Sequence, residues 1–108
     1  MKVYPGGVDA VVERFTGTVD VCTFVIQDPL LGEDVGVAVV LESATDTALV
    51  ELHRWTATHL AAHQRPRSWY VLEEIPRTSR GKVNRASVAA YCANKNPVPY
   101  GTLLRRQG

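Results

Sequence analysis

The sequence has 108 residues, of which 45% are hydrophobic and 21% charged, and its formal net charge is +1. This length and composition are typical of one small folded domain and exclude both a disordered chain and two independently cored domains. Because no uncharged apolar run approaches the ~20 residues of a membrane-spanning helix and no signal-peptide core follows Met1, we predict a cytoplasmic protein with no membrane partner.

The first half of the chain predicts a short helix followed by two strands. Apolar residues recur at helical spacing behind Pro5, which predicts a helix over residues 7–14. Two β-branched runs, 19–26 and 35–41, are separated by turn-forming residues at 27–34 and predict two strands. The second run contains no polar side chain, so we expect it to be buried on both faces.

The second half predicts a longer helix, a third strand and a last helix. Thr45 or Asp46 can cap the longer helix, whose apolar stripe extends to about residue 62 and should lie on the sheet. Residues 69–72 predict the third strand, and residues 83–91 predict the last helix.

This order of elements predicts the fold class and the domain organisation. The class is α+β, with a small three-stranded sheet, helices packed on it, and the order α-β-β-α-β-α. Residues 1–93 are assigned to a single domain. Residues 94–108 are predicted to be a flexible tail, because Pro97, Pro99 and Gly101 interrupt any helical or strand pattern.

Charge is distributed unevenly along the chain. Residues 1–51 hold two basic and nine acidic side chains, whereas residues 52–108 hold ten basic and two acidic ones, a net charge of +8. Six of these basic side chains fall within 21 positions, which predicts either an anion site, such as a phosphate site, or a solvated basic face. The six are Arg65, Arg67, Arg77, Arg80, Lys82 and Arg85. Aromatic residues are not interleaved with the basic loop at residues 76–85, so no nucleic acid partner is predicted.

Within this cluster, a polar loop ends in Gly81 and Lys82 at the start of the last predicted helix. Glycine lets the backbone approach a ligand closely, lysine carries a compact charge on a long stem, and a helix N-terminus adds partial positive charge. All three features favour an anion. A phosphate-binding loop of the nucleotide-triphosphatase type is excluded, because Pro76 stands at its first glycine position and Val83 follows the lysine.

Three motifs in the same order resemble the adenylate-forming superfamily of acyl-CoA synthetases, peptide-synthetase adenylation domains and luciferases. Residues 76–85 match its motif Pro-Arg/Lys-Thr-x-x-Gly-Lys-x-x-Arg at every defined position. Residues 27–33 are similar to its Asp-Pro-x-x-Gly-Glu loop, and residues 60–66 to a segment in which the family usually has an aromatic residue and a lysine where His63 and Gln64 stand. The resemblance covers about residues 2–92. Its front, Val3-Tyr4-Pro5 followed by Val8-Asp9, is similar to the Val-x-Pro-x-Glu-Val/Ile-Glu stretch just beyond the family's hinge.

The resemblance implies the small C-terminal lobe of an ATP-dependent acid-activating ligase. In the family this lobe rotates between an orientation for adenylate formation and one for thioester formation. The resemblance implies Lys82 as the catalytic residue, which stabilises charge between the carboxylate substrate and the α-phosphate of ATP. It implies Gly81, Arg77 and Arg85 as substrate- or ATP-binding residues, with the two arginines either fastening the loop or facing phosphate.

The resemblance also implies cofactors and partners. ATP with Mg²⁺ would be bound mainly by a large N-terminal lobe absent from this sequence, and the acceptor would be CoA or a phosphopantetheine carrier such as an acyl carrier protein. Two interpretations of this chain stay open: it is a separately encoded lobe, or it is a piece of a longer synthetase. A third interpretation is a non-catalytic docking or regulatory module, although the intact Gly81-Lys82 argues against it. The sequence identifies neither the acid nor the oligomeric state. No metal site is predicted, because His59 and His63 lack a third ligand at suitable spacing.

Overall fold

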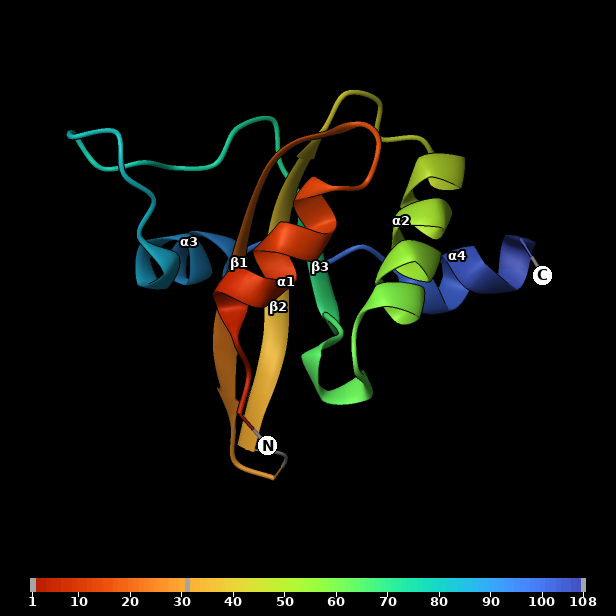
Figure 1. Ribbon diagram of the computed structural model, residues 1–108, viewed down its shortest axis with the longest axis horizontal. Coiled ribbons are helices and arrows are strands. Elements are labelled where there is room, and N and C mark those ends of the chain that lie inside the picture. Colours follow the sequence, from red (N-terminus) through yellow and green to blue (C-terminus); the bar gives the residue numbers. More distant parts are fainter. Residues whose placement is uncertain (1, 31, 108) are drawn as a thin grey trace.

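The computed structural model describes residues 2–30 and 32–107, which form one sheet with helices on both of its faces (Figure 1). The strands are β1 (Thr18–Asp28), β2 (Gly32–Leu41) and β3 (Ser68–Val71), in the spatial order β1-β2-β3. The α+β class and the predicted order α-β-β-α-β-α are confirmed. Among the described residues, no helix combines the length and apolar character needed to cross a membrane.

The sheet mixes antiparallel and parallel pairing. β1 and β2 are antiparallel, with Cys22 opposite Ala38. β2 and β3 are parallel, with Val37 opposite Trp69. A parallel pair needs a long crossover connection, which the helix between β2 and β3 provides.

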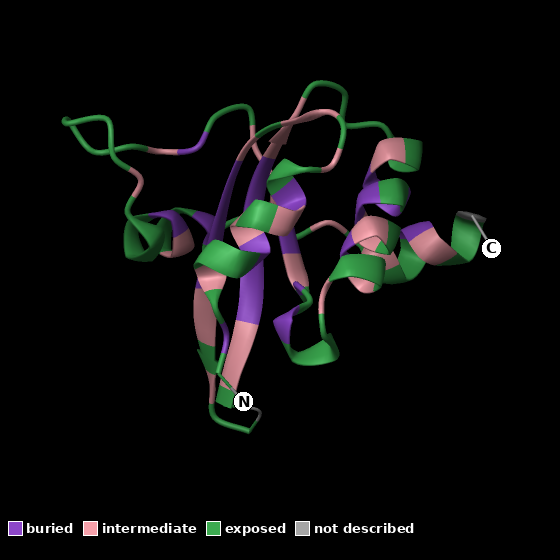
Figure 2. Cartoon of the chain, in the orientation of Figure 1, coloured by how far each residue is buried: buried purple, intermediate pink, exposed green. Residues whose placement is uncertain are grey.

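Two hydrophobic clusters cover the two faces of the sheet. Helices α1 (Pro5–Glu13) and α2 (Asp46–His59) pack on one face, and α3 (Arg85–Cys92) packs on the other. Side chains of β2 alternate between the clusters, with Val37 in the first and Ala38 in the second. Residues 35–39 are all buried, which confirms the prediction for these five residues and appears as the purple centre of the sheet in Figure 2, whereas Val40 and Leu41 are half-buried.

Gly36 is a position in β2 where no side chain fits. Phe24 lies opposite it on β1, and a Cβ atom built on Gly36 would stand 2.4 Å from Cε2 of the Phe24 ring. Such a distance is far below van der Waals contact. The glycine therefore leaves the space that the buried Phe24 ring occupies beside β2.

Side chains set the starts of two helices. Thr45 Oγ1 accepts a hydrogen bond from the Ala48 amide at 3.1 Å and caps α2. Asn84 Oδ1 accepts one from the Ser87 amide at 3.0 Å, so α3 begins at residue 85 instead of the predicted 83. α2 ends at residue 59, three residues earlier than predicted, because Leu60 adopts an extended conformation before a short 3₁₀ turn.

A fourth helix, α4 (Tyr100–Gln107), occupies most of the segment predicted to be a flexible tail. The Tyr100 hydroxyl donates a hydrogen bond to the Leu49 carbonyl in α2 at 2.8 Å, and Leu103 is buried. The Val98 amide donates to the Trp69 carbonyl of β3 at 2.8 Å. The expectation that this segment lacks regular structure is therefore wrong, because contacts with α2 and β3 outweigh its local proline and glycine content.

His53 of α2 packs against the Tyr100 ring, with ring centroids 4.9 Å apart, and burial lowers the pKa of His53. Because the pKa of His53 is lower in the folded state, the unfolded chain binds the imidazole proton more tightly than the folded chain does. The stability that neutral His53 contributes is therefore fully present above the unfolded pKa of about 6.5, and it is lost as the pH falls through the lowered pKa of the folded state. We expect the melting temperature to fall more between pH 7 and pH 5 in the wild type than in His53→Gln. Circular dichroism melts measure this.

If His53→Gln keeps the full pH dependence of the wild type, His53 is not the group responsible.

Candidate active-site loop

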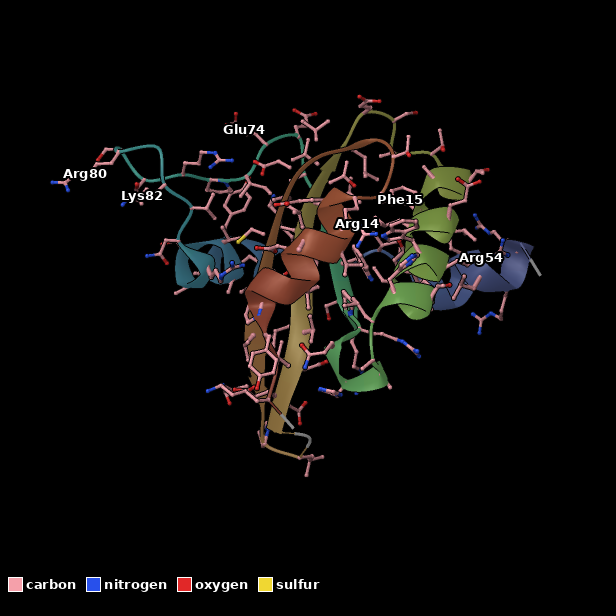
Figure 3. All side chains as sticks on the ribbon, in the orientation of Figure 1. Arg14, Phe15, Arg54, Glu74, Arg80 and Lys82 are labelled. Carbon is pink, nitrogen blue, oxygen red and sulfur yellow. The ribbon has the colours of Figure 1, made fainter. Side chains whose placement is uncertain are left out.

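Residues 72–84 connect β3 to α3 without regular secondary structure and are called the Lys82 loop below. The loop extends away from the sheet, and Figure 3 shows Arg80 and Lys82 at its outer end. Residues 77–82 are all exposed. Closer to the sheet, Ile75 is buried in the second cluster and Val83 packs against it. Apolar contacts therefore hold both sides of the loop, while its outer part is free to meet a ligand or partner.

The outer end of the loop is a closed turn built by Thr78. The Thr78 carbonyl accepts a hydrogen bond from the Gly81 amide at 2.9 Å, and the Thr78 amide donates to the Lys82 carbonyl at 2.7 Å. Its hydroxyl oxygen Oγ1 accepts from the Lys82 amide at 3.2 Å. This pattern is typical of a turn with a glycine bulge, in which two residues occupy the centre. The threonine of the motif therefore positions the lysine backbone.

Gly81 has a φ angle of +79°, the left-handed conformation that completes this turn. A Cβ atom at this position would meet nothing within 4 Å. The requirement for glycine therefore comes from the backbone conformation, which costs other residues about 1–2 kcal/mol. Its predicted role in binding stays a prediction, and its role in shaping the turn follows from this geometry.

Arg77 and Arg85 both pair with aspartates of this chain. Arg77 Nη2 lies 2.6 Å from Asp20 Oδ2 in β1, and Arg85 Nη1 lies 2.7 Å from Asp9 Oδ2 in α1. Arg85 Nη1 also donates to the Thr23 carbonyl at 2.9 Å. This geometry favours the interpretation that the arginines fasten the loop, and a direct contact of either one with ATP or substrate stays a prediction. Exposed pairs of this kind contribute only about 0.2–1 kcal/mol to stability, so their main effect is on geometry.

Lys82 itself is exposed, and its backbone is held while its side chain is not. Its amide and carbonyl both bond to Thr78. In the part of the chain that the structure describes, its ammonium group makes no hydrogen bond or ion pair. The arrangement thus presents an unneutralised cation on an ordered turn, which is chemically suited to an anionic ligand.

Residues 7–82 match the family described as AMP-binding enzyme C-terminal domain. The chain belongs to this family. It is 35% identical over 98 residues to a fatty acid–[acyl-carrier-protein] ligase, MmaC, of Mycobacterium marinum, a match that covers 83% of this chain and 18% of the relative. It is 31% identical over 81 residues to a medium/long-chain-fatty-acid–CoA/3-oxocholest-4-en-26-oate–CoA ligase of Mycolicibacterium smegmatis. This match covers 75% of this chain and 15% of the relative. The chain thus spans less than a fifth of these relatives.

Solved structures of ligases share the fold of this AMP-binding enzyme C-terminal domain. The fatty acyl CoA synthetase of Mycobacterium tuberculosis superposes with a TM-score of 0.77 at 23% identity, over 90% of this chain and 19% of that one. ATP-bound MatB from Rhodopseudomonas palustris superposes with a TM-score of 0.74 at 18% identity, over 87% of this chain and 19% of the MatB chain. At these identities the likeness shows the fold alone, whereas the match to the family over residues 7–82 confirms the resemblance seen in the motifs.

Gln64 is a residue whose role sequence reasoning missed. Its side chain is nearly buried, its Oε1 accepts a hydrogen bond from the Tyr4 amide at 2.9 Å, and its Nε2 donates to the Lys2 carbonyl at 2.7 Å. These two bonds hold the N-terminal segment of the domain in place. The sequence did contain one indication of this role, since the family usually has a lysine where Gln64 stands. Such a departure predicts that the contacts of this side chain differ from those in the family, but it does not identify the new partners.

A polar recess of about 340 Å³ lies between α1, β1 and the Lys82 loop. Its walls include the two aspartate–arginine pairs and the Cys22 side chain. Burial, followed by the charge of Asp9, raises the pKa of the Cys22 thiol to about 11. The thiol is therefore protonated at neutral pH and unsuited to act as a nucleophile.

Among residues 2–30 and 32–107, no group of three His, Cys, Asp or Glu side chains could hold a metal ion.

Proposed function

We propose that this AMP-binding enzyme C-terminal domain supplies a catalytic lysine, Lys82, to an ATP-dependent acid-activating ligase. The observation that carries the proposal is an exposed ammonium group that has no partner among the described residues, on a turn closed by three hydrogen bonds, at the lysine of the matched motif. The backbone of Lys82 is therefore already in position, and only its side chain has to be ordered when it meets a ligand.

The chemistry assigned to Lys82 is stabilisation of moving negative charge. In adenylate formation, a carboxylate oxygen of the acid attacks the α-phosphorus of ATP, the bond from that phosphorus to the bridging oxygen breaks, and pyrophosphate leaves with the electron pair. Charge increases on the oxygens around the α-phosphorus during this step. A lysine ammonium directed at these oxygens stabilises the transition state, and no proton transfer from the lysine is required.

The acid-binding pocket and most ATP contacts are proposed to lie on a large lobe that acts with this domain. The domain corresponds to less than a fifth of its ligase relatives, and the relatives' names include both CoA and acyl-carrier-protein ligases. CoA or a phosphopantetheine carrier is accordingly the proposed acceptor for a second step, thioester formation. Mg²⁺ is proposed to accompany ATP on the large lobe, as the family resemblance implies.

A hybrid ligase tests the proposal. The C-terminal segment of MmaC that aligns with this chain is replaced by this chain, and fatty-acid-dependent exchange of pyrophosphate into ATP is measured. We expect exchange well above that of MmaC without the segment, and none from this chain alone. A correctly folded hybrid that exchanges no faster than truncated MmaC would contradict the proposal. Binding of the chain to truncated MmaC without any exchange would support a docking or regulatory module instead.

A further inference from the structure

Two aspartates outside the lysine motif each hold one end of the Lys82 loop. Asp20 Oδ2 accepts the Arg77 Nη2 hydrogen bond at 2.6 Å, immediately before the turn at residues 78–82. Asp9 Oδ2 accepts the Arg85 Nη1 hydrogen bond at 2.7 Å, just after the loop ends. The exposed turn thus lies between two tethers.

Both carboxylates are oriented by the backbone of β1 before they reach the arginines. Asp20 Oδ1 accepts a hydrogen bond from the Val21 amide at 2.9 Å, and Asp9 Oδ1 accepts one from the Thr23 amide at 2.7 Å. Thr23 is fully buried, so the second tether is fixed to the centre of the sheet. Each arginine therefore meets a carboxylate that is already held in place.

Arg77 continues this chain of contacts into the turn. Its Nη1 lies 3.5 Å from the Gly81 carbonyl, one residue before Lys82. Apolar packing from the core ends at Ile75 on one side of the loop and resumes at Val83 on the other. Between these points residues 77–82 are exposed, so the arginine–aspartate pairs add polar contacts from the two ends of this stretch to β1 and α1, beside the apolar contacts of Ile75 and Val83.

We propose that Asp20 and Asp9 are positioning residues, which act through Arg77 and Arg85 to hold the Lys82 backbone at a fixed place relative to the sheet. The proposal rests on the catalytic role proposed for Lys82. Displacement of a catalytic group by about 1 Å can cost a factor of about 10² in rate. Loss of a tether should therefore slow the reaction without changing which groups bind ATP.

The first test measures the order of the turn in this chain alone. Asp20→Asn keeps an Oδ1 acceptor for the Val21 amide and removes the charge that pairs with Arg77. We expect backbone ¹⁵N order parameters at residues 78–82 to fall from about 0.85 toward 0.6, values typical of rigid and flexible backbone. Asp9→Asn should act in the same direction.

Asp34→Asn is the matched control. Asp34 Oδ1 also accepts its neighbour's amide, that of Val35, at 2.8 Å, and Asp34 pairs with Arg67 at 3.9 Å in another part of the sheet. The control should leave the order parameters of the turn unchanged. Unchanged order parameters in Asp20→Asn would overturn the proposal, whatever the catalytic role of Lys82.

The second test uses the hybrid ligase. Asp20→Asn, Arg77→Gln and the double variant should each lower kcat for adenylation by the same factor, about ten- to a hundredfold, with KM for ATP within about twofold of the wild type. The charge swap Asp20→Arg with Arg77→Asp should recover part of the loss. If Arg77→Gln raises KM for ATP while Asp20→Asn does not, Arg77 binds ATP directly and the positioning role is overturned. A hybrid insensitive to Lys82→Ala would refute the proposed function, and the order parameters would still report on the tethers.

Discussion

Replacing Lys82 with alanine is expected to slow acyl-adenylate formation in the hybrid ligase by a factor of ~10²–10³, the usual effect of losing one preorganised transition-state contact. The melting temperature should not change, because the Lys82 side chain is exposed and has no partner among the described residues. Single-turnover formation of the acyl-adenylate measures the chemical step, and differential scanning calorimetry measures the folded state. Loss of rate without loss of stability separates a catalytic lysine from a structural one.

Lys95→Ala is the control for this substitution. Lys95 is also an exposed lysine of this domain, and its Nζ lies 4.6 Å from the centroid of the Tyr91 ring, outside the Lys82 loop. We expect its rate to stay within about twofold of the wild type, because surface substitutions away from special features have small effects. Equal rates for Lys82→Ala and the wild type would remove Lys82 from the catalytic role.

The second large effect is expected at Gly36, where alanine should lower the free energy of unfolding by about 1–3 kcal/mol, the usual cost of overpacking a core. The added methyl group would stand 2.4 Å from the buried Phe24 ring, so strand or ring must move. Urea denaturation at pH 7 measures the change. Phe24→Leu in the Gly36→Ala background should recover part of it, because the smaller side chain vacates the space that the methyl group needs.

Gly101→Ala provides the opposite control in α4. A Cβ atom at Gly101 would meet nothing within 4 Å, and the residue lies in a helix. Alanine should therefore raise the free energy of unfolding by about 0.5–1 kcal/mol, since it restricts the unfolded chain and favours the helix. Destabilisation by Gly101→Ala would contradict the presence of α4, and a neutral Gly36→Ala would contradict the close contact with Phe24.

Several features of this domain could be predicted from local sequence alone. The β-branched runs predict β1 and β2 because their side chains suit an extended, buried backbone, and Thr45 predicts the start of α2 because a hydroxyl satisfies free amides there. The turn around Lys82 is also local, since all its hydrogen bonds join residues no more than four positions apart. The motif and the shape of the turn can therefore be inferred together.

The partners of the two arginines could not be predicted in the same way. Arg77 is 57 positions from Asp20 and Arg85 is 76 positions from Asp9, so no local pattern relates them. Only the pairing of the strands and the packing of α1 on β1 place these carboxylates beside the loop. The two hydrogen bonds of Gln64 to the N-terminal segment have the same origin, with separations of 60 and 62 positions.

α4 shows most clearly what tertiary structure decides. Its segment contains glycine and two prolines, which locally favour turns, and helix propensities differ by only about 1 kcal/mol per residue outside proline. Burial of Leu103 and the hydrogen bond from Tyr100 to α2 supply free energy of comparable or greater size. Local sequence thus determined the strands, the start of α2 and the lysine turn, because their interactions join near neighbours. The formation of α4 and of the arginine–aspartate pairs that tether the loop depends on tertiary structure, because their interactions exist only after distant segments have packed together.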